Sequence, residues 1–422
     1  MAKNTRSAAK IPIPAVIKRN TILLAATQAL FQGAIQSVVV IAPLSIFYFT
    51  QSTVLGALAF SVVIGGRTLV AYSAGRFMDS VGRKKVLYAG IFVSCSALIV
   101  MTFALYIFSI WFFWIGVFIF SIGAGVMNML RVPVTDMYPT SRLGEGMGYM
   151  LTGSIIGALI PTVLSSLASF FAFTSLNAYE IMLLFSVPMM AIGILLVKLI
   201  SPDTREILRN LKSYYPQDVN VATYIDGKQD LTSVQVTSRS RSVIAAFIAS
   251  SFGWGGMVMS KSIISIMLQQ LGVELTLINL ALSIHVFGMF GPSIPWGWLT
   301  DRWGRRIVIA LGGVILGTGA FFMPITRDYR IVTFGFFLIG LGWSATNVAS
   351  TALLCDLTTE QRRGSMLGAN DVANGLASLT FPTVGGIVLS SFGLFAFGMV
   401  GMLAALPIVL SMILSIVASV EE

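Results

Sequence analysis

Gly75-Arg-Phe-Met-Asp-Ser-Val-Gly-Arg-Lys-Lys85 is a charged stretch with two glycines that lies between two long apolar runs. A second copy, Gly297-Trp-Leu-Thr-Asp-Arg-Trp-Gly-Arg-Arg306, keeps the order Gly, Asp, Gly, Arg and begins 222 residues later, slightly more than half the chain length. A charged, glycine-bearing turn that recurs near the midpoint predicts a chain built from two related halves.

A second repeat supports the same division. Asp136, Arg142 and Gly144 recur as Asp356, Arg362 and Gly364, each shifted by 220 residues. Between the halves, residues 201–242 form the one long polar stretch, with two prolines, a run of Ser and Thr, and mixed charge. We expect this stretch to be a tether, with one interfacial helix around Ile207–Tyr215.

The composition indicates a membrane protein. Of the 422 residues, 56% are hydrophobic and only 10% are charged, which is too little polar surface for a soluble multi-domain protein. The net charge of +10 does not indicate a nucleic-acid partner, because the Lys and Arg residues lie between apolar segments and are not gathered on one exposed face. The expected surroundings are a lipid bilayer.

The apolar segments predict α-helices that cross the membrane. About 20 apolar residues are needed to span the hydrocarbon core, and these uninterrupted runs lack the alternation of barrel strands. The fold class is therefore an all-α membrane protein with twelve transmembrane helices in two pseudo-symmetric six-helix bundles. The predicted spans are 21–49, 53–74, 86–108, 110–130, 146–169, 181–200, 243–268, 275–298, 307–325, 331–353, 366–391 and 395–418.

The distribution of Lys and Arg predicts the orientation. With the N-terminus inside, Lys and Arg gather in the inner loops, whereas the outer loops hold only Arg327 and Arg330. We expect a multi-pass protein of the plasma membrane with both termini and both copies of the opening motif in the cytoplasm. The predicted regions are an inner tail 1–20, a six-helix bundle 21–200, a linker 201–242, a second bundle 243–418 and a short tail 419–422.

The motif resembles the signature of the major facilitator superfamily, Gly-x-x-x-Asp-x-x-Gly-Arg-Arg/Lys, which follows the second helix and recurs weakly after the eighth. The resemblance covers essentially the whole chain. It implies a secondary transporter that works by alternating access, with its site near mid-membrane between the halves, acting as a monomer and without a cofactor. No phosphate-binding Gly-x-x-x-x-Gly-Lys-Ser/Thr loop occurs, and no nucleophile–base pairing points to an enzyme.

The resemblance also implies that the motif is a conformational latch. Its aspartate would accept from a neighbouring arginine and face the positive N-terminus of the 366–391 helix. We expect Asp79 to accept from Arg83 or Arg131. The candidate latch residues are Gly75, Asp79, Gly82, Arg83, Arg131, Asp136, Gly297, Asp301, Gly304 and Arg305.

Few polar groups lie deep in the predicted spans, and each is a candidate for substrate binding or ion coupling. Gln28, Gln32 and Gln36 recur every four residues, so their amides share one helix face. Two interpretations are open for that face: it lines a cavity, or its amides bond to neighbouring helices.

Lys261 lies about two turns from the outer end of the 243–268 span, where it either snorkels to the surface or serves the substrate. Asp371 lies near the inner end of the 366–391 span, between Asn370 and Asn374, which share a face. Two interpretations are open for Asp371: its charge is stabilised by the positive end of the helix dipole, or it is a titrating coupling group or a cavity ligand.

The single histidine suggests a second type of cargo. His285 and Met289 lie on one helix face, and imidazole with thioether suits a soft cation such as Cu(I). His285-x-x-x-Met289 followed by Pro292 resembles the branch of the superfamily that imports copper for cytochrome oxidase assembly. That branch has a Met-x-x-x-Met pair in its seventh helix, whereas this chain has Met259 with Gly255 four residues earlier.

Three functions are therefore weighed from the sequence. The first is a transporter of a small organic metabolite or drug-like molecule, coupled to an ion. The second is a copper importer that uses His285, Met289 and Met259. The third is a transporter-shaped sensor that binds a ligand without moving it.

Overall fold

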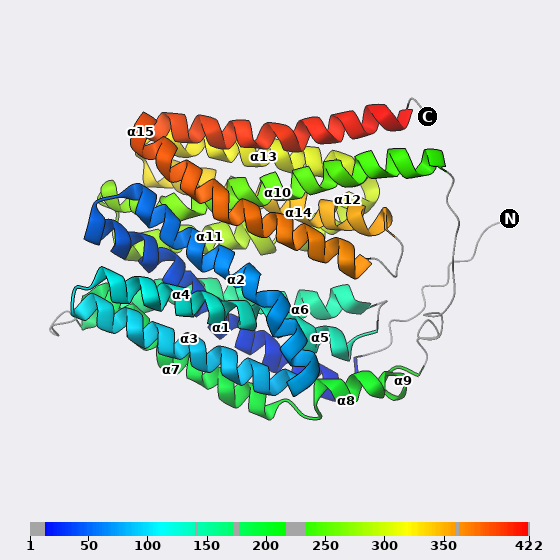
Figure 1. Ribbon diagram of the computed structural model, residues 1–422, viewed down its shortest axis with the longest axis horizontal. Coiled ribbons are helices and arrows are strands. Elements are labelled where there is room, and N and C mark those ends of the chain that lie inside the picture. Colours follow the sequence, from blue (N-terminus) through cyan, green and yellow to red (C-terminus); the bar gives the residue numbers. More distant parts are fainter. Residues whose placement is uncertain (1–12, 140–141, 172–176, 217–232, 359–362, 421–422) are drawn as a thin grey trace.

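The computed structural model describes residues 13–139, 142–171, 177–216, 233–358 and 363–420, and every element in these ranges is a helix. The prediction of an all-α fold is therefore confirmed (Figure 1). Side-chain surroundings at some positions within helices, among them Gly75 and Asp79, lie outside this description, as do residues 1–12 of the predicted tail and 217–232 of the linker.

The first half of the chain forms α1 to α9. Their bounds are α1 Ala15–Thr50, α2 Thr53–Val81, α3 Arg83–Tyr106, α4 Ile110–Met127, α5 Arg131–Met137, α6 Leu143–Phe170, α7 Ala178–Leu199, α8 Thr204–Arg209 and α9 Leu211–Tyr214. A 3-10 turn, Asn128–Leu130, joins α4 to α5. The interfacial helix expected around Ile207–Tyr215 is instead the two short helices α8 and α9.

The second half forms α10 to α15. Their bounds are α10 Ser233–Gln270, α11 Leu275–Phe290, α12 Ser293–Trp303, α13 Arg305–Ile325, α14 Tyr329–Asp356 and α15 Arg363–Val420. The predicted 275–298 span is broken between α11 and α12. The chain turns back within α15 at Gly393, whose φ of 81° is not helical, so α15 comprises two antiparallel limbs (Figure 1).

Ten helices among the described residues are long and apolar enough to cross a membrane. One of these ten, Met366–Ser415, contains both limbs of α15. The apolar part of α2, Thr53–Arg67, is shorter and is not one of the ten. If the two limbs of α15 are counted separately and α2 is added, each of the twelve predicted spans has a corresponding helix.

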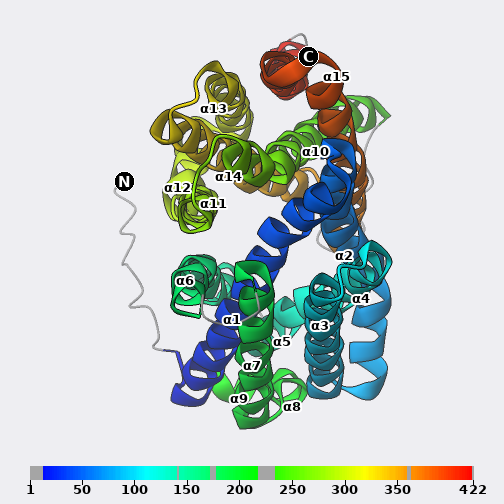
Figure 2. The same cartoon turned by 90° about the vertical axis from the view of Figure 1, so that its left-hand side faces the viewer.

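The helices gather in two groups, seen end-on in Figure 2, with α1 and α3–α9 in one group and α10–α15 in the other. We call these groups the N-terminal half, which includes α2, and the C-terminal half. We call the end of the bundle where α2 meets α3, α12 meets α13 and α8 lies the charged end (Figure 1). The end where α1 meets α2, α10 meets α11 and the two limbs of α15 meet is the opposite end.

The second glycine of each motif copy allows a reversal of the chain within one residue. Gly82 lies between α2 and α3 with a φ of 112°, and Gly304 lies between α12 and α13 with a φ of 93°. Residues with a Cβ rarely adopt such angles, so glycine at both positions lets two long helices meet without a loop. The arginine that follows each glycine, Arg83 or Arg305, is thereby the first residue of a helix.

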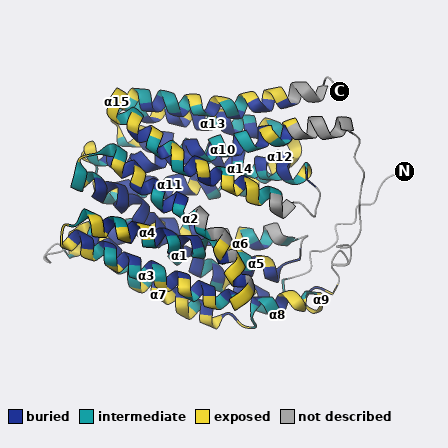
Figure 3. Cartoon of the chain, in the orientation of Figure 1, coloured by how far each residue is buried: buried dark blue, intermediate teal, exposed yellow. Residues whose placement is uncertain are grey.

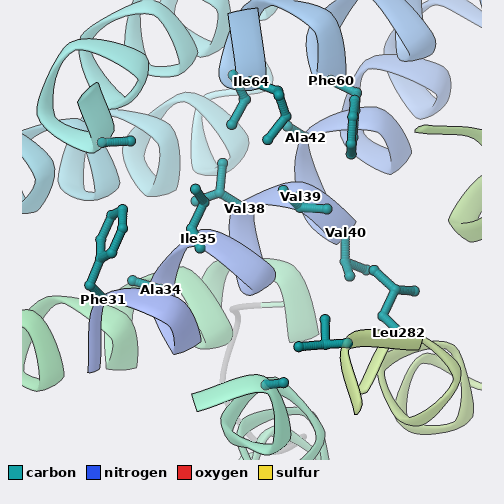
Figure 4. Packing of buried hydrophobic residues seen from close by; sticks show 14 of the residues in the cluster. Phe31, Ala34, Ile35, Val38, Val39, Val40, Ala42, Phe60, Ile64 and Leu282 are labelled. Carbon is teal, nitrogen blue, oxygen red and sulfur yellow. The ribbon is translucent and has the colours of Figure 1, made fainter. Parts of the chain in front are cut away.

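The packed centre lies where the two halves meet toward the opposite end. Residues 33–46 of α1 and 255–268 of α10 are all buried (Figure 3). Figure 4 shows Val38, Val39 and Val40 of α1 among Ile64 of α2 and Leu282 of α11, so this segment contacts both halves.

Glycines bring α2 into close contact with the C-terminal half. A Cβ on Gly56 would lie 2.7 Å from Ile266 Cδ1 of α10, and one on Gly386 of α15 would lie 3.1 Å from Val54 Cα at the start of α2. Small residues permit this approach, which van der Waals contact stabilises inside a bilayer. The halves are therefore sealed together at the opposite end.

The contact between α1 and α6 yields a stability prediction. A Cβ on Gly153 of α6 would lie 2.1 Å from the Ala25 carbonyl oxygen, whereas one on Gly148 of the same helix meets nothing within 4 Å. Gly153→Ala should force α6 away from α1 and lower the melting temperature in detergent, by a destabilisation of about 1–3 kcal/mol.

Gly148→Ala is the matched control. It should leave the melting temperature unchanged or raise it, because alanine favours a helix over glycine by about 1 kcal/mol. Equal melting temperatures for the Gly153→Ala protein and the parent would contradict the close α1–α6 contact.

Candidate functional site between the two halves

The two sequence repeats meet in space as repeated ion pairs at the charged end. Arg83 Nε lies 2.9 Å from Asp136 Oδ2, and Arg305 Nε lies 3.0 Å from Asp356 Oδ2. Each pair joins the arginine that opens one helix to an aspartate near the end of another. The 222-residue repeat and the 220-residue repeat are thus two parts of one structural unit that occurs in each half.

Both arginines expected to bond Asp79 have described partners on neighbouring helices. Arg83 pairs with Asp136, and Arg131 pairs with Asp371. The side chain of Asp79 lies outside the described residues, so its bond to Arg83 or Arg131 stays a prediction. Its counterpart in the second copy, Asp301, accepts from Arg305 Nη1 at 2.5 Å.

The two repeated pairs differ in burial. The side chains of Arg83 and Asp136 are 9% and 7% exposed, and Thr204 of α8 also donates to Asp136 Oδ2 at 3.4 Å. The side chains of Arg305 and Asp356 are 26% and 54% exposed. A buried charge depends on its partner far more than a solvated one does. The pair in the N-terminal half is therefore the structural one.

A third ion pair crosses between the halves. Arg131 Nη2 of α5 lies 3.4 Å from Asp371 Oδ2 of α15, and the two side chains are 44% and 53% exposed. A half-solvated pair of this kind contributes about 0–1 kcal/mol. It can therefore form and break without a large change in stability.

Lys261 lies deep between the halves. It is 7% exposed, and its Nζ donates to Gln36 Oε1 of α1 at 3.0 Å. Snorkelling to the surface, the simpler explanation weighed from the sequence, is therefore wrong. Gln36 Nε2 is buried and has no hydrogen-bond partner among the residues that the structure describes.

The other two glutamines of α1 have different surroundings. Gln28 donates to Ser154 of α6 at 3.0 Å, which is the interhelical bonding that was left open. Gln32 is half-buried, and its Cβ lies 2.8 Å from the position a Cβ on Gly157 would take. The glutamine face of α1 therefore contacts α6 through Gln28 and Gln32 and contacts α10 through Gln36.

The amides near Asp371 belong to one network. Asn370 Nδ2 donates to Ser250 Oγ of α10 at 3.1 Å, and Ser250 donates to Asn374 Oδ1 at 3.2 Å. The prediction that these two amides share a face is confirmed. The network fixes α15 against α10, so Asp371 is presented toward the N-terminal half.

The candidate soft-metal ligands face different helices. His285 is stacked on Phe336 of α14 at 3.9 Å between ring centroids, and its Nδ1 lies 2.7 Å from the Phe336 carbonyl oxygen. Met259 instead packs beside Gly385 and Gly401 of α15. Met289, on the same helix as His285, is buried. The described contacts of His285 and Met259 are thus packing contacts, with α14 and α15 respectively.

Several contacts between these helices were not predicted. Thr162 of α6 and Ser283 of α11 lie 3.3 Å apart between their hydroxyl oxygens and join the two halves. Trp254 of α10 packs edge-on against Trp343 of α14 at 5.0 Å. Ser and Thr are common in membrane helices and mostly bond their own backbone, so nothing in their spacing distinguishes such a pair.

A groove of about 1020 Å³ lies elsewhere, on the N-terminal half. α1, α6 and α7 line it, and its wall includes the exposed side chains of Ile22, Ile156 and Ile192. None of the predicted substrate candidates lines it. We therefore place the candidate site at Lys261 and Gln36, between the halves.

Two halves joined around buried polar groups, with a repeated charged motif at one end, are the features expected of a known family. The sequence model of the Major Facilitator Superfamily matches residues 22–261 and 243–421. The chain belongs to the Major Facilitator Superfamily. Membership confirms the predicted family, and it makes the chain a membrane transport protein and not an enzyme.

Curated relatives resemble most of the chain in sequence, and a solved structure resembles it in fold. An uncharacterized MFS-type transporter, YdeG of Bacillus subtilis, is 23% identical over 80% of this chain and 78% of its own. The riboflavin transporter RfnT of Brucella anthropi is 23% identical over 84% of this chain and 85% of its own. A POT family transporter crystallised with 5-aminolevulinic acid superposes with a TM-score of 0.73 at 14% identity, covering 95% and 96% of the two chains.

The difference in burial between the repeated ion pairs gives a stability prediction. Asp136→Asn should remove a counter-charge from the buried Arg83 guanidinium and destabilise the protein by about 3–5 kcal/mol. Asp356→Asn, at the repeated position, should cost about 0–1 kcal/mol because its pair is partly solvated. Urea or thermal unfolding in detergent measures both, and equal losses for the two variants would contradict the assignment.

Proposed function

We propose that the chain is a secondary transporter that moves a small organic solute across the membrane by alternating access. The observation that carries this proposal is the Arg131–Asp371 pair, which joins the halves at the charged end while the glycine contacts of α2 seal them at the opposite end. A solute held near Lys261 between these two contacts would reach one side or the other depending on which contact opens.

The charged end is proposed to face the cytoplasm. Arg76, Lys85, Arg302 and Arg306 lie at this end, and positive residues of short loops are retained on the cytoplasmic side. At the opposite end, the only Lys or Arg residues in the loops between the predicted spans are Arg327 and Arg330. Both termini are then cytoplasmic.

The two contacts differ in kind, which suits a reversible switch. The opposite end is closed by apolar packing against glycine, whereas the charged end is closed by a solvated ion pair. When the halves separate at the charged end, water can solvate both Arg131 and Asp371, so the net cost of opening is small. We propose that this pair is the working latch and that Arg83–Asp136 holds its N-terminal side rigid.

A small organic solute is the favoured cargo. The riboflavin transporter RfnT aligns over most of the chain, and the site contains amide, hydroxyl and ammonium groups suited to an organic molecule. Asp371 is the proposed coupling group, since it is a half-exposed carboxylate in the contact that must break. No observation favours the copper alternative over packing roles for His285 and Met259.

The latch predicts a change in access from the charged end. Leu379 of α15 lies two turns deeper than Asp371 and contacts Gly65 of the other half. In a protein with both native cysteines replaced, Asp371→Asn or Arg131→Gln should raise the rate at which Leu379→Cys reacts with a membrane-impermeant maleimide in inside-out vesicles. A pair worth up to about 1 kcal/mol implies an increase of up to about fivefold.

Two further variants make this test specific. The exchange Arg131→Asp with Asp371→Arg restores opposite charges and should return the rate toward that of the parent. Asp356→Asn breaks an ion pair within one half and should leave the rate unchanged. A rate that rises equally in the Asp356→Asn variant, or that stays high in the exchanged variant, would exclude Arg131–Asp371 as the latch.

A further inference from the structure

The described groups at the interface between the halves carry more positive than negative charge. Lys261 is buried there, and its described partner is the neutral amide oxygen of Gln36. Arg67 of α2 interacts electrostatically with Lys261, Arg131 and Asp371. Asp371 is the one carboxylate in this set, and it already pairs with Arg131. Lys261 is thus a buried cation without a described counter-ion.

Unused hydrogen-bond donors lie beside this cation. Gln36 accepts from Lys261 through Oε1, and its Nε2 is buried without a partner. Ser265, one helical turn from Lys261 on the same face of α10, also has a buried hydroxyl without a partner in the described part of the chain. A buried donor that is left unpaired costs free energy, so this group of donors favours an acceptor that carries negative charge.

An aromatic wall lies further along the same helix face. Trp254 is two turns from Lys261 in the direction of the charged end, and it packs edge-on against Trp343 of α14 at 5.0 Å. Phe290 of α11 lies 6.1 Å from Trp343 between ring centroids. Aromatic rings offer a large apolar contact surface to a flat organic group.

We propose that the solute bound between the halves is an organic carboxylate with an apolar or aromatic body. Its carboxylate accepts from Lys261 Nζ and Gln36 Nε2, and its body lies toward Trp254. The proposal rests on the proposed transport function, because it names the class of solute for the same site. A carboxylate supplies the counter-charge that Lys261 lacks, whereas a neutral solute of the same shape leaves that cation unpaired.

The test compares carboxylates with their primary amides, which are similar in shape but neutral. Benzoate, 2-naphthoate and indole-3-acetate, each beside its amide, are titrated into the purified full-length protein by isothermal calorimetry. At least one carboxylate should bind, and it should bind about 10- to 100-fold more tightly than its amide, as expected for hydrogen bonds to a charged group. No binding of any carboxylate, or equal binding of carboxylate and amide, overturns the proposal.

Variants of Lys261 assign the preference to this residue. Lys261→Met should remove the preference for the carboxylate, and it should fold because a buried cation is replaced by an apolar chain of similar length. Lys261→Arg keeps the charge and should keep the preference. Lys85→Met, at an exposed position of the charged end, should leave the preference unchanged. A preference that survives in Lys261→Met overturns the proposal.

Exchange in proteoliposomes separates this proposal from the transport function. If a carboxylate binds through Lys261 but is not exchanged across the bilayer, the binding site is upheld and the transport function fails. If neutral solutes are exchanged equally by the parent and Lys261→Met proteins and no carboxylate competes, transport is upheld and the carboxylate site is overturned.

Discussion

A polar side chain within a membrane span has to find its hydrogen-bond partner inside the protein, because hydrocarbon offers none. The described contacts of this chain follow from that constraint. Gln28 bonds to Ser154, and Asn370 and Asn374 share Ser250, so each of these partnerships ties one helix to a neighbour in the same half. Lys261 differs, because its partner Gln36 lies in the other half. A buried cation of the spans is therefore placed at the interface between the halves.

The charged end combines a rigid part and a labile part. In the N-terminal half, the buried Arg83–Asp136 pair is joined by Thr204 of α8. Lys84 donates to the Ile200 carbonyl, so the start of the linker is also held against this half. The solvated Arg131–Asp371 pair joins the halves at this end. A rigid support beside a weak contact concentrates movement at the weak contact, as the proposed alternating access requires.

The sequence predicted the fold well because its strongest signals are physical requirements of a bilayer. Apolar runs of spanning length specify helices, and the repeated Gly-Asp-Gly-Arg motif specifies two halves. Partners were harder to predict. The sequence did not predict that Arg83 pairs with Asp136, 53 residues away in the chain, because α3 and α5 become neighbours only in the fold. Lys261 could not be assigned from the sequence, since snorkelling and burial differ only in the rotation of α10 about its axis.

The central claim, alternating access, is tested most directly by measuring distances between the halves. Double electron–electron resonance gives these distances between pairs of spin labels. One pair is placed at Thr135 and Gly368, which lie on the helix faces of Arg131 and Asp371, and the other at Gln51 and Glu274 at the opposite end. Alternating access predicts two populations whose distances change in opposite directions, with the Thr135–Gly368 distance long when the Gln51–Glu274 distance is short. Asp371→Asn should enlarge the population with the long distance at the charged end. A single fixed distance at each end, or lengthening at both ends together, would contradict the account.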